Sequence, residues 1–225
     1  MKRPFSLAAT LLAVLLPSTL SAATVTGKVA FVAKRGQHPI AAETLVWLES
    51  VGRTTPRRPA NFQMVTRGKA LEPHVLAVPL GSTVEFPNDD PISHNLFSLS
   101  PGNSFDLGLY RKGSGKAYKF DKPGLVNVYC NVHPNMSAVI HVMTSPFYTL
   151  ADAAGTYALP DVPPGKYRLV AWNEQGGQSE AEIEVSPAGL VSGSLALTLD
   201  SRNFHRADHM NKEGKPYNPP TEREY

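Results

Sequence analysis

The sequence predicts an all-β protein built from β-sandwiches. Short runs rich in β-branched and aromatic residues recur along the chain, turn residues separate them, and no useful stretch has the 3.6-residue helical period. Residues 125–129 (LVNVY) alternate in polarity, which is typical of a strand with one buried face. Strands are expected at Val25–Val32, Thr44–Leu48, His74–Val78, Thr83–Phe86, Gly124–Tyr129, Ala138–Met143, Tyr167–Trp172, Ala181–Val185 and Leu195–Leu199.

The composition narrows the class of protein further. The 225 residues are 42% hydrophobic and 18% charged, and they include 17 Gly and 20 Pro. The charged fraction lies below the ~25% of an average globular domain, while the apolar fraction is ordinary. These values exclude a disordered chain, a coiled coil and collagen, and they indicate many turns.

The first 23 residues have the features of a secretory signal peptide. Two basic residues precede the apolar run 5–16, and the small residues 21–23 predict cleavage before Thr24. The alternative is an uncleaved anchor, but the apolar run is shorter than the ~20 residues that cross a bilayer. We therefore expect an exported, periplasmic protein with no membrane span after cleavage.

The charge excludes nucleic acid as a partner. The formal net charge is +3, and removal of Lys2 and Arg3 with the signal leaves 20 basic residues against 19 acidic ones. No basic face of the kind that binds nucleic acid survives this subtraction. One basic cluster, Arg53, Arg57 and Arg58, lies among prolines. We interpret it first as a solvated linker and, as the alternative, as a docking patch.

Cys130 is the single cysteine of the chain. In an oxidising compartment a lone cysteine cannot form an internal disulfide. It is therefore a buried inert thiol, a free thiol, an intermolecular bridge or a metal ligand, and its neighbours must decide between these.

Cys130 begins a C-x2-H-x2-M pattern with His133 and Met136, directly after a predicted strand. A further imidazole, His94, stands upstream where another strand is entered. Two His, one Cys and a weak axial Met are the ligand set of a blue-copper electron-transfer site, because thiolate and thioether are soft donors. A short loop between two strands can bring three of these donors around one ion.

Two other chemistries compete for these residues. A structural zinc site uses Cys and His, commonly in C-x2-C pairs, and the chain has no second cysteine. Cys130 and His133 alone could form a reactive thiol with its base. That arrangement lacks a matching Asn or Gln and leaves Met136 without a role, so copper is the favoured interpretation.

The residues around this pattern resemble the cupredoxins. Residues 73–90 (PHVLAVPLGSTVEFPNDD) are followed by His94-Asn95, which is similar to the family's approach to its first ligand, and Pro134 follows His133 as in amicyanin-like members. The resemblance implies a Greek-key sandwich with one mononuclear type 1 copper. It implies that His94, Cys130 and His133 are equatorial ligands and Met136 is the axial one.

The same resemblance assigns roles to neighbouring residues. It implies that the Asn95 amide ties the two ligand loops together and that Pro134 removes a backbone N–H near the sulfur, which raises the reduction potential. The His133 side of the loop is then the point of electron entry. Residues 110–116 depart from the family pattern, since they are longer and more polar than a minimal cupredoxin requires.

The rest of the chain resembles the carboxypeptidase-regulatory, transthyretin-like sandwich. The similarity lies in an opening strand pair within residues 26–48, an Asp-x-x-Gly-x-Tyr turn at 152–157 and a Pro-Gly-x-Tyr hairpin at 164–167. An alternative assigns residues 24–50 to the central domain. The favoured division is a signal peptide at 1–23, a discontinuous regulatory-like sandwich at 24–50 plus 145–200, a cupredoxin domain at 60–143 and a polar, extended C-terminal tail at 201–225.

The whole chain is similar to bacterial periplasmic proteins described as methylamine-utilisation-like, a label that does not establish methylamine as a substrate. The resemblance implies a carrier, not an enzyme, that moves single electrons between periplasmic redox proteins such as a cytochrome or a dehydrogenase. One alternative is a copper-binding or delivery protein. Another is a partner-binding sandwich with no redox role.

Several residues outside the pattern are weaker candidates for metal binding. His74, Met64 and His141 are interpreted as surface or packing residues. The tail could capture a second copper, but a solvated tail is the favoured interpretation for its donors His205, His209 and Met210.

Overall fold

The computed structural model describes residues 22–50, 55–205 and 208–217, and within them the chain is almost entirely β-structure. The only helical segment of the described residues is a single 3-10 turn at Ala41–Glu43. The all-β, sandwich-type fold class is therefore confirmed. No helix in these ranges is long and apolar enough to cross a membrane. Apart from Ala22 and Ala23, the predicted signal segment lies outside the described residues.

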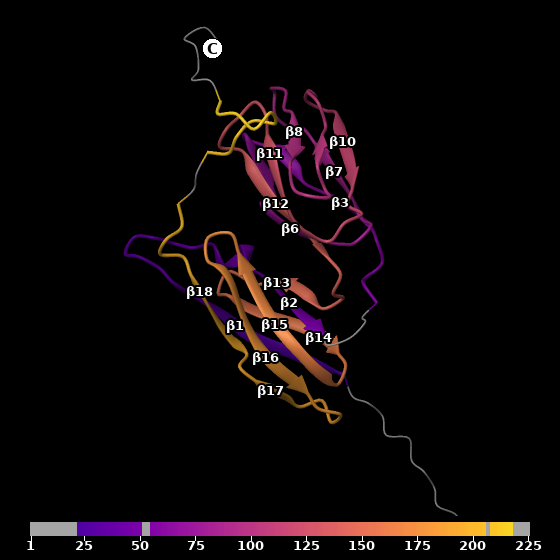
Figure 1. The fold of residues 1–225 in the computed structure, drawn as a ribbon, viewed down its shortest axis with the longest axis vertical. Coiled ribbons are helices and arrows are strands. Elements are labelled where there is room, and N and C mark those ends of the chain that lie inside the picture. The colour runs from indigo at the N-terminus through magenta and orange to yellow at the C-terminus, as the bar shows by residue number, and fades with distance from the viewer. Residues whose placement is uncertain (1–21, 51–54, 206–207, 218–225) are drawn as a thin grey trace, which may run out of the picture.

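One part of the molecule, which we call the site half, is formed by β3 to β12 (Figure 1). Its core contains Met64, Phe86, Leu96, Phe120 and Ile140, all fully buried. A three-stranded sheet contains, in spatial order, β10 (Gly115–Lys119), β7 (Thr83–Pro87) and β3 (Asn61–Gln63). A five-stranded sheet contains β6 (Val75–Pro79), β12 (Ser137–Met143), β11 (Gly124–Cys130), β8 (Leu96–Ser98) and β9 (Phe105–Asp106). A separate hairpin is formed by β4 (Val65–Arg67) and β5 (Ala70–Glu72).

The other part, the flanking half, joins the first strands of the chain to the last ones. Its core contains Val25, Leu48, Leu159, Leu169 and Leu199. A three-stranded sheet contains, in spatial order, β14 (Thr156–Val162), β1 (Ala23–Val32) and β18 (Ala196–Asp200). A five-stranded sheet contains β13 (Tyr148–Leu150), β2 (Leu45–Ser50), β15 (Gly165–Asn173), β16 (Gly177–Val185) and β17 (Val191–Gly193).

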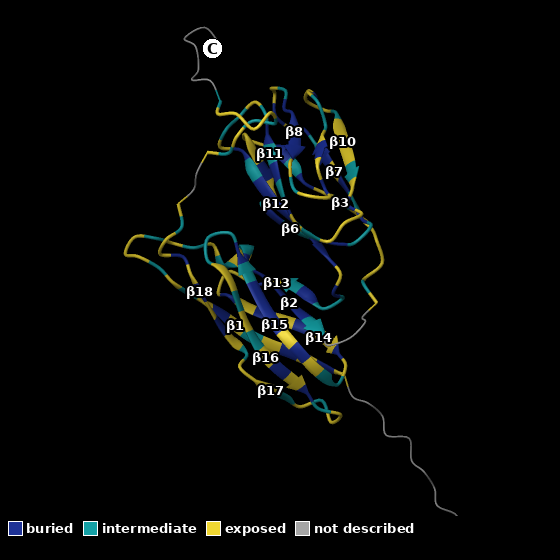
Figure 2. Cartoon of the chain, viewed as in Figure 1, coloured by how far each residue is buried: buried dark blue, intermediate teal, exposed yellow. Residues whose placement is uncertain are grey.

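The chain thus leaves the flanking half after β2 and returns to it at β13. β1 pairs with β14 and β18, and β2 pairs with β13 and β15, so the strands on either side of residues 61–143 share sheets. Figure 2 shows buried residues gathered on β8, β11 and β12 in one half and on β2 and β15 in the other, whereas β10 is mostly exposed. The domain boundaries given above stay a prediction.

A third, smaller apolar cluster lies between the two halves. Trp47 of β2 and Met143 of β12 belong to it, and Trp172 packs against it. The ring of His141 lies between these two tryptophans, with centroids 5.3 Å from Trp47 and 5.7 Å from Trp172. Aromatic contacts therefore join the halves at a partly buried histidine.

Arg57 and Arg58 are exposed in an irregular segment, as a solvated linker requires, but the Arg57 side chain does not extend freely into solvent. Its guanidinium donates to the carbonyl oxygens of Pro146 (2.7 Å) and Tyr148 (3.0 Å) and lies 4.1 Å from the centroid of the Tyr148 ring. Arg53 lies outside the described residues. Arg57 instead fastens the segment before β3 to β13.

Each of the nine strands expected from the sequence overlaps an observed strand. The unexpected ones are mostly two to five residues long, and a pattern of two-residue period has little room to develop in them. β14 is longer, but Pro160 and Asp161, whose φ is 57°, interrupt its pattern. Proline in a strand normally argues against a central strand, and β14 lies at the edge of its sheet.

Candidate metal centre

The loop between β11 and β12 carries three of the four predicted ligands. Cys130 ends β11 and is fully buried, and its N–H donates to the carbonyl of Met136 at 3.1 Å. The N–H of Met136 donates to the carbonyl of His133 at 3.1 Å. These two bonds close the loop on itself and leave His133 half-buried at its tip.

The fourth predicted ligand, His94, is fully buried just before β8. Its N–H donates to the carbonyl of Tyr110 at 3.0 Å, and its carbonyl accepts from the Tyr110 N–H at 2.9 Å. This isolated bridge fixes the backbone of His94 from the side opposite the ligand loop.

Three of the predicted ligands converge in space. The Sγ atom of Cys130 lies 3.6 Å from Nδ1 of His94 and 3.7 Å from Nδ1 of His133. These three residues are also the only His, Cys, Asp or Glu cluster with metal-ligand spacing in the described ranges, their ligand atoms lying within 4.8 Å of one another. Met136 is buried in the same core cluster as Cys130. Its role as the axial ligand stays a prediction, as do the roles of the other three.

Asp90 orients the buried imidazole of His94. The Nε2 atom of His94 lies 2.9 Å from Oδ2 of Asp90, so a proton on Nε2 leaves the Nδ1 lone pair facing Cys130. The carboxylate also accepts N–H bonds from Gly68 (2.6 Å) and Lys69 (2.9 Å). Metal-bound histidines commonly hold their other ring nitrogen in this way.

The turn between β4 and β5 supplies those two N–H groups. Gly68 and Lys69 have φ of 62° and 60°, the left-handed conformation that a two-residue type I′ hairpin requires at both central positions. Lysine rarely adopts this conformation, and the bond from its N–H to Asp90 helps to hold it. The hairpin thus reaches the metal centre through one carboxylate.

Burial keeps both imidazoles neutral. Desolvation lowers the pKa of His94 despite the opposing effect of Asp90. Desolvation also lowers the pKa of His133, and the nearby His94 and Lys69 act in the same direction. Neutral imidazole is the form that binds a metal, so the site is prepared for one at neutral pH.

The donor set fits copper. One sulfur and two imidazole nitrogens face a common point from a buried, hydrogen-bonded surrounding, and the thiolate favours copper or zinc over magnesium or calcium. Zinc usually takes four strong donors from Cys, His and carboxylates. Met136, which is buried in the same core cluster as Cys130, offers a weak thioether donor, and such a donor suits copper better than zinc.

Asn95 ties the two ligand loops together by a different group from the one expected. Its main-chain carbonyl accepts the N–H of Asn131 at 2.8 Å. Its side-chain amide instead donates to Oδ1 of Asp106 at 2.6 Å. The expectation that the Asn95 side-chain amide joins the two loops is therefore wrong, because the main-chain carbonyl of Asn95 makes that hydrogen bond.

The sequence does not predict that the side chains of Asn88 and Asp90 fix the loop and the ring of His94 by hydrogen bonds. Asn88 donates to the carbonyl of Ile92 (2.9 Å) and accepts the N–H of Asp90 (2.9 Å), which shapes the loop leading to His94. The Asn-x-Asp spacing of Asn88 and Asp90, at the end of residues 73–90, is the sequence signal for this hydrogen-bonded turn.

The weaker candidates lie outside the cluster. Met64 is fully buried in the core of the site half. His74 contacts Glu174 (Nε2 to Oε2, 2.7 Å) and the carbonyl of Ser137. His141 lies between two tryptophans, while Met210 is 53% exposed.

His209 differs from the expectation of a solvated tail. Its ring stacks on Tyr129, with centroids 4.4 Å apart and planes at 23°. His205, in contrast, is exposed. The tail therefore packs against β11 at His209.

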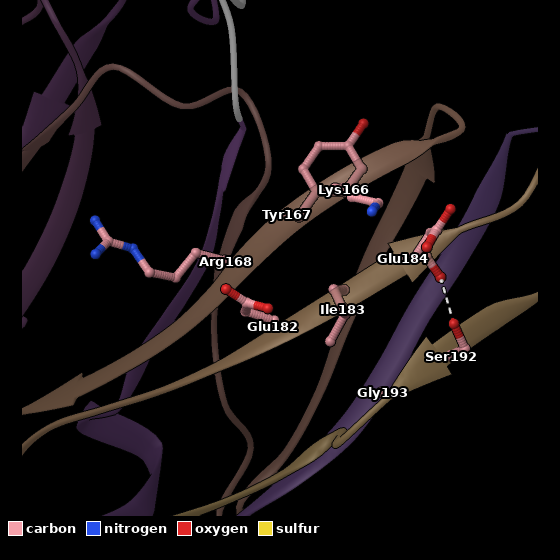
Figure 3. A pocket seen from close by; sticks show the side chains of 8 residues that line it. All are labelled: Lys166, Tyr167, Arg168, Glu182, Ile183, Glu184, Ser192 and Gly193. Carbon is pink, nitrogen blue, oxygen red and sulfur yellow. Dashed lines mark hydrogen bonds between the residues drawn. The ribbon is translucent and has the colours of Figure 1, made fainter.

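A surface hollow of about 340 Å³ lies in the flanking half, between β15, β16 and β17 (Figure 3). Its wall includes Lys166 and Glu184, which are cross-strand neighbours, and Arg168, which pairs with Glu49 and Glu180. No histidine or cysteine lines it. Its chemistry is that of a charged sheet surface, unlike the ligand cluster of the site half.

The fold and cluster define an all-β protein with a His-Cys-His centre, and comparisons with known proteins give partial likenesses. A sequence model of polysaccharide lyase family 4, domain II, matches residues 134–192, less than half of the chain. This match runs from the ligand loop into the flanking half. A search of curated protein sequences finds no match.

Among solved structures, several cupredoxins are similar to part of this chain. A purple cupredoxin from Nitrosopumilus maritimus is 25% identical, with 36% of this chain and 98% of that one covered and a TM-score of 0.34. An oxidised mutant of amicyanin is 17% identical, with 43% and 99% covered and a TM-score of 0.35. A pseudoazurin from Sinorhizobium meliloti is 22% identical, with 37% and 74% covered and a TM-score of 0.31.

Proposed function

We propose that this protein is a mononuclear type 1 copper protein that carries single electrons between redox partners. One observation supports this above the others: Cys130 Sγ lies within 3.7 Å of the Nδ1 atoms of both His94 and His133, and Cys130 and His94 are fully buried. His94, Cys130 and His133 would hold the metal with Met136 as a weak fourth ligand. When bound, copper supplies a reversible one-electron change between its +1 and +2 states.

The chain's own part is to keep the donors in one arrangement in both oxidation states. Asp90 holds the His94 ring, and the bond from Asn131 to Asn95 holds the two loops together. All four ligands would come from the protein, which leaves no open position for a substrate. For this reason we propose a carrier and not an enzyme.

The surface near His133 suits brief contact with a partner. Val132 is 46% exposed beside His133, and Ile92 and Leu109 are 37% and 64% exposed in the loops on either side of His94 and its bridge to Tyr110. These exposed apolar side chains would form the apolar centre of a small contact surface. An electron would enter and leave here, donated by one reduced protein and accepted by one oxidised protein.

The partners belong to the class of periplasmic redox proteins, a cytochrome or a dehydrogenase. This location follows from the basic, apolar and small-residue regions of the predicted signal segment. The regulatory-like assignment of the flanking half, with boundaries at 24–50 and 145–200, and the methylamine-utilisation-like resemblance belong to the same proposal.

The test is a titration of the purified mature protein with Cu(II), followed by visible absorption. We expect an intense band at roughly 600 nm from copper–thiolate charge transfer, saturating at one equivalent. Cys130→Ser should lack the band, and Ser98→Ala, a change at another buried position of the site half, should keep it.

The other outcomes separate the competing functions. A colourless protein that binds Cu(I) tightly and transfers it quickly to an acceptor would indicate copper delivery. A protein that binds neither ion, and whose stability copper does not change, would leave a partner-binding sandwich.

A further inference from the structure

The C-terminal segment 208–217, which we call the strap, lies against the end of the site half that carries the ligands. In Figure 1 its yellow ribbon passes beside the end of β11. The sequence marks it as polar, with few apolar residues to bury. Its contacts are nevertheless directed at the ligand loop.

Two polar contacts join the strap to the main chain and side chain of that loop. The hydroxyl of Tyr217 donates to the carbonyl of Cys130 at 2.6 Å. The N–H of Lys212 donates to Oδ1 of Asn131 at 2.9 Å. The strap thus binds Cys130 itself and the residue that follows it.

A third contact closes a ring of bonds through both ligand loops. The ammonium of Lys212 lies 2.8 Å from Oδ2 of Asp106, and Asp106 Oδ1 accepts from the Asn95 amide. Asn95 in turn accepts the N–H of Asn131. The Lys212 ammonium, followed by these hydrogen bonds, lowers the pKa of Asp106 to about 2, so the carboxylate stays charged near neutral pH.

The strap also has a defined shape of its own. Asn211 Oδ1 accepts N–H bonds from Glu213 (3.1 Å) and Lys215 (2.9 Å), which forms a turn. The ring of His209 stacks on Tyr129, and Tyr217 meets His209 edge-on at 5.4 Å. These rings place the Tyr217 hydroxyl at the Cys130 carbonyl.

We propose that the strap is a positioning element of the metal centre, in which Tyr217 and Lys212 hold the ligand loop closed on His94. This inference rests on the proposed function for the identity of the metal, but its effect on the loop does not. Release of a metal requires the loop to open. A loop held by the strap opens less often than one held only by its own bonds, and the bound metal leaves more slowly.

The experiment compares the full chain with Tyr217→Phe, which keeps the ring on His209 and removes the hydroxyl. Tyr167→Phe is the matched control, because its hydroxyl donates to the carbonyl of Pro163 at 2.9 Å in the flanking half. The first readout is deuterium exchange of the amides of residues 130–136 in metal-free protein. The second is the rate at which the Cu(I)-loaded protein loses metal to excess bicinchoninate.

For Tyr217→Phe we expect exchange and Cu(I) loss to be roughly fivefold to tenfold faster, the size expected from the lost hydrogen bond to Cys130, because the second contact of the hydroxyl, to Nδ1 of His209, is longer at 3.4 Å. Tyr167→Phe should leave both rates unchanged. Equal rates for Tyr217→Phe and the parent, or a loss of global stability with unchanged loop exchange, would overturn the inference. If the parent binds no copper, the proposed function fails, while the exchange experiment still decides the role of the strap.

Discussion

The two halves of the molecule use the same kind of sheet but treat polar groups differently. In the flanking half, β15 and β16 pair without a break from Gly165 to Asn173, and charged side chains such as Arg168 remain outside. The site half has shorter strands and buries the carboxylate of Asp90 and the imidazole of His94. Long regular pairing makes a scaffold, whereas the metal centre depends on loops whose polar atoms are satisfied individually.

The largest change that we expect is a loss of stability that leaves metal binding intact. Leu169 is fully buried in the core of the flanking half, so Leu169→Ala should lower the free energy of unfolding by about 2–5 kcal/mol. The copper spectrum of the folded variant should not change. Urea unfolding and the Cu(II) titration measure the two effects.

The control for this change is Leu190→Ala, since Leu190 is 72% exposed. It should alter the free energy of unfolding by no more than about 0.5 kcal/mol. A Leu169→Ala variant that folds but has lost the copper band would show that the metal centre depends on the packing of the flanking half.

The second effect concerns pH and the contact between the halves. Burial lowers the pKa of His141 from 6.5 to about 4, so between these values the unfolded chain binds more protons than the folded one. The free energy of unfolding of the metal-free protein should therefore fall as the pH drops from 6.5 to 4. The loss due to His141 is about 3 kcal/mol, at 1.36 kcal/mol per pKa unit.

His141→Phe keeps an aromatic ring between Trp47 and Trp172 and removes the titration. The lowered pKa values of His94 and His133 add an acid-dependent loss of their own, which the variant retains. The difference between parent and variant, measured by urea unfolding across this pH range, isolates His141. Parallel pH profiles would refute this account of the interface.

The third effect tests whether Asp90 serves the metal. In Asp90→Asn the new amide N–H₂ group faces the N–H groups of Gly68 and Lys69, which need an acceptor, and its hold on His94 is weakened. We expect copper binding to weaken about 10- to 100-fold, the effect typical of losing a residue that orients a metal-bound histidine. Competition with a chelator measures this. Asp89→Asn is the matched control, because the Asp89 side chain forms an exposed ion pair with Arg67. Equal losses in both variants would assign the effect to general charge.

The sequence predicts much of this arrangement where the signal is local. The alternation of residues 125–129 and the spacing of Cys130, His133 and Met136 lie within one strand and one loop, so they can be recognised without the fold. His94 follows a recognisable strand and turn, and this local signal predicts it as a ligand. The structure brings it against Cys130 as the pattern requires.

The missing parts depend on contacts between distant residues. Asp90 is held by a hairpin turn about twenty residues upstream, and Tyr217 reaches Cys130 across 87 positions. His141 acquires its low pKa only when β12 meets both tryptophans. Neither polarity nor periodicity carries information about such contacts, and the tail has too few apolar residues for its composition to indicate where it packs.

If the proposed function holds, the site half presents a preformed sulfur and two nitrogens to one copper ion. X-ray absorption at the copper edge of the loaded protein, in both oxidation states, tests this arrangement. We expect one sulfur at thiolate distance and two imidazole nitrogens, with little change on reduction. A shell of nitrogen and oxygen without a thiolate sulfur would contradict it.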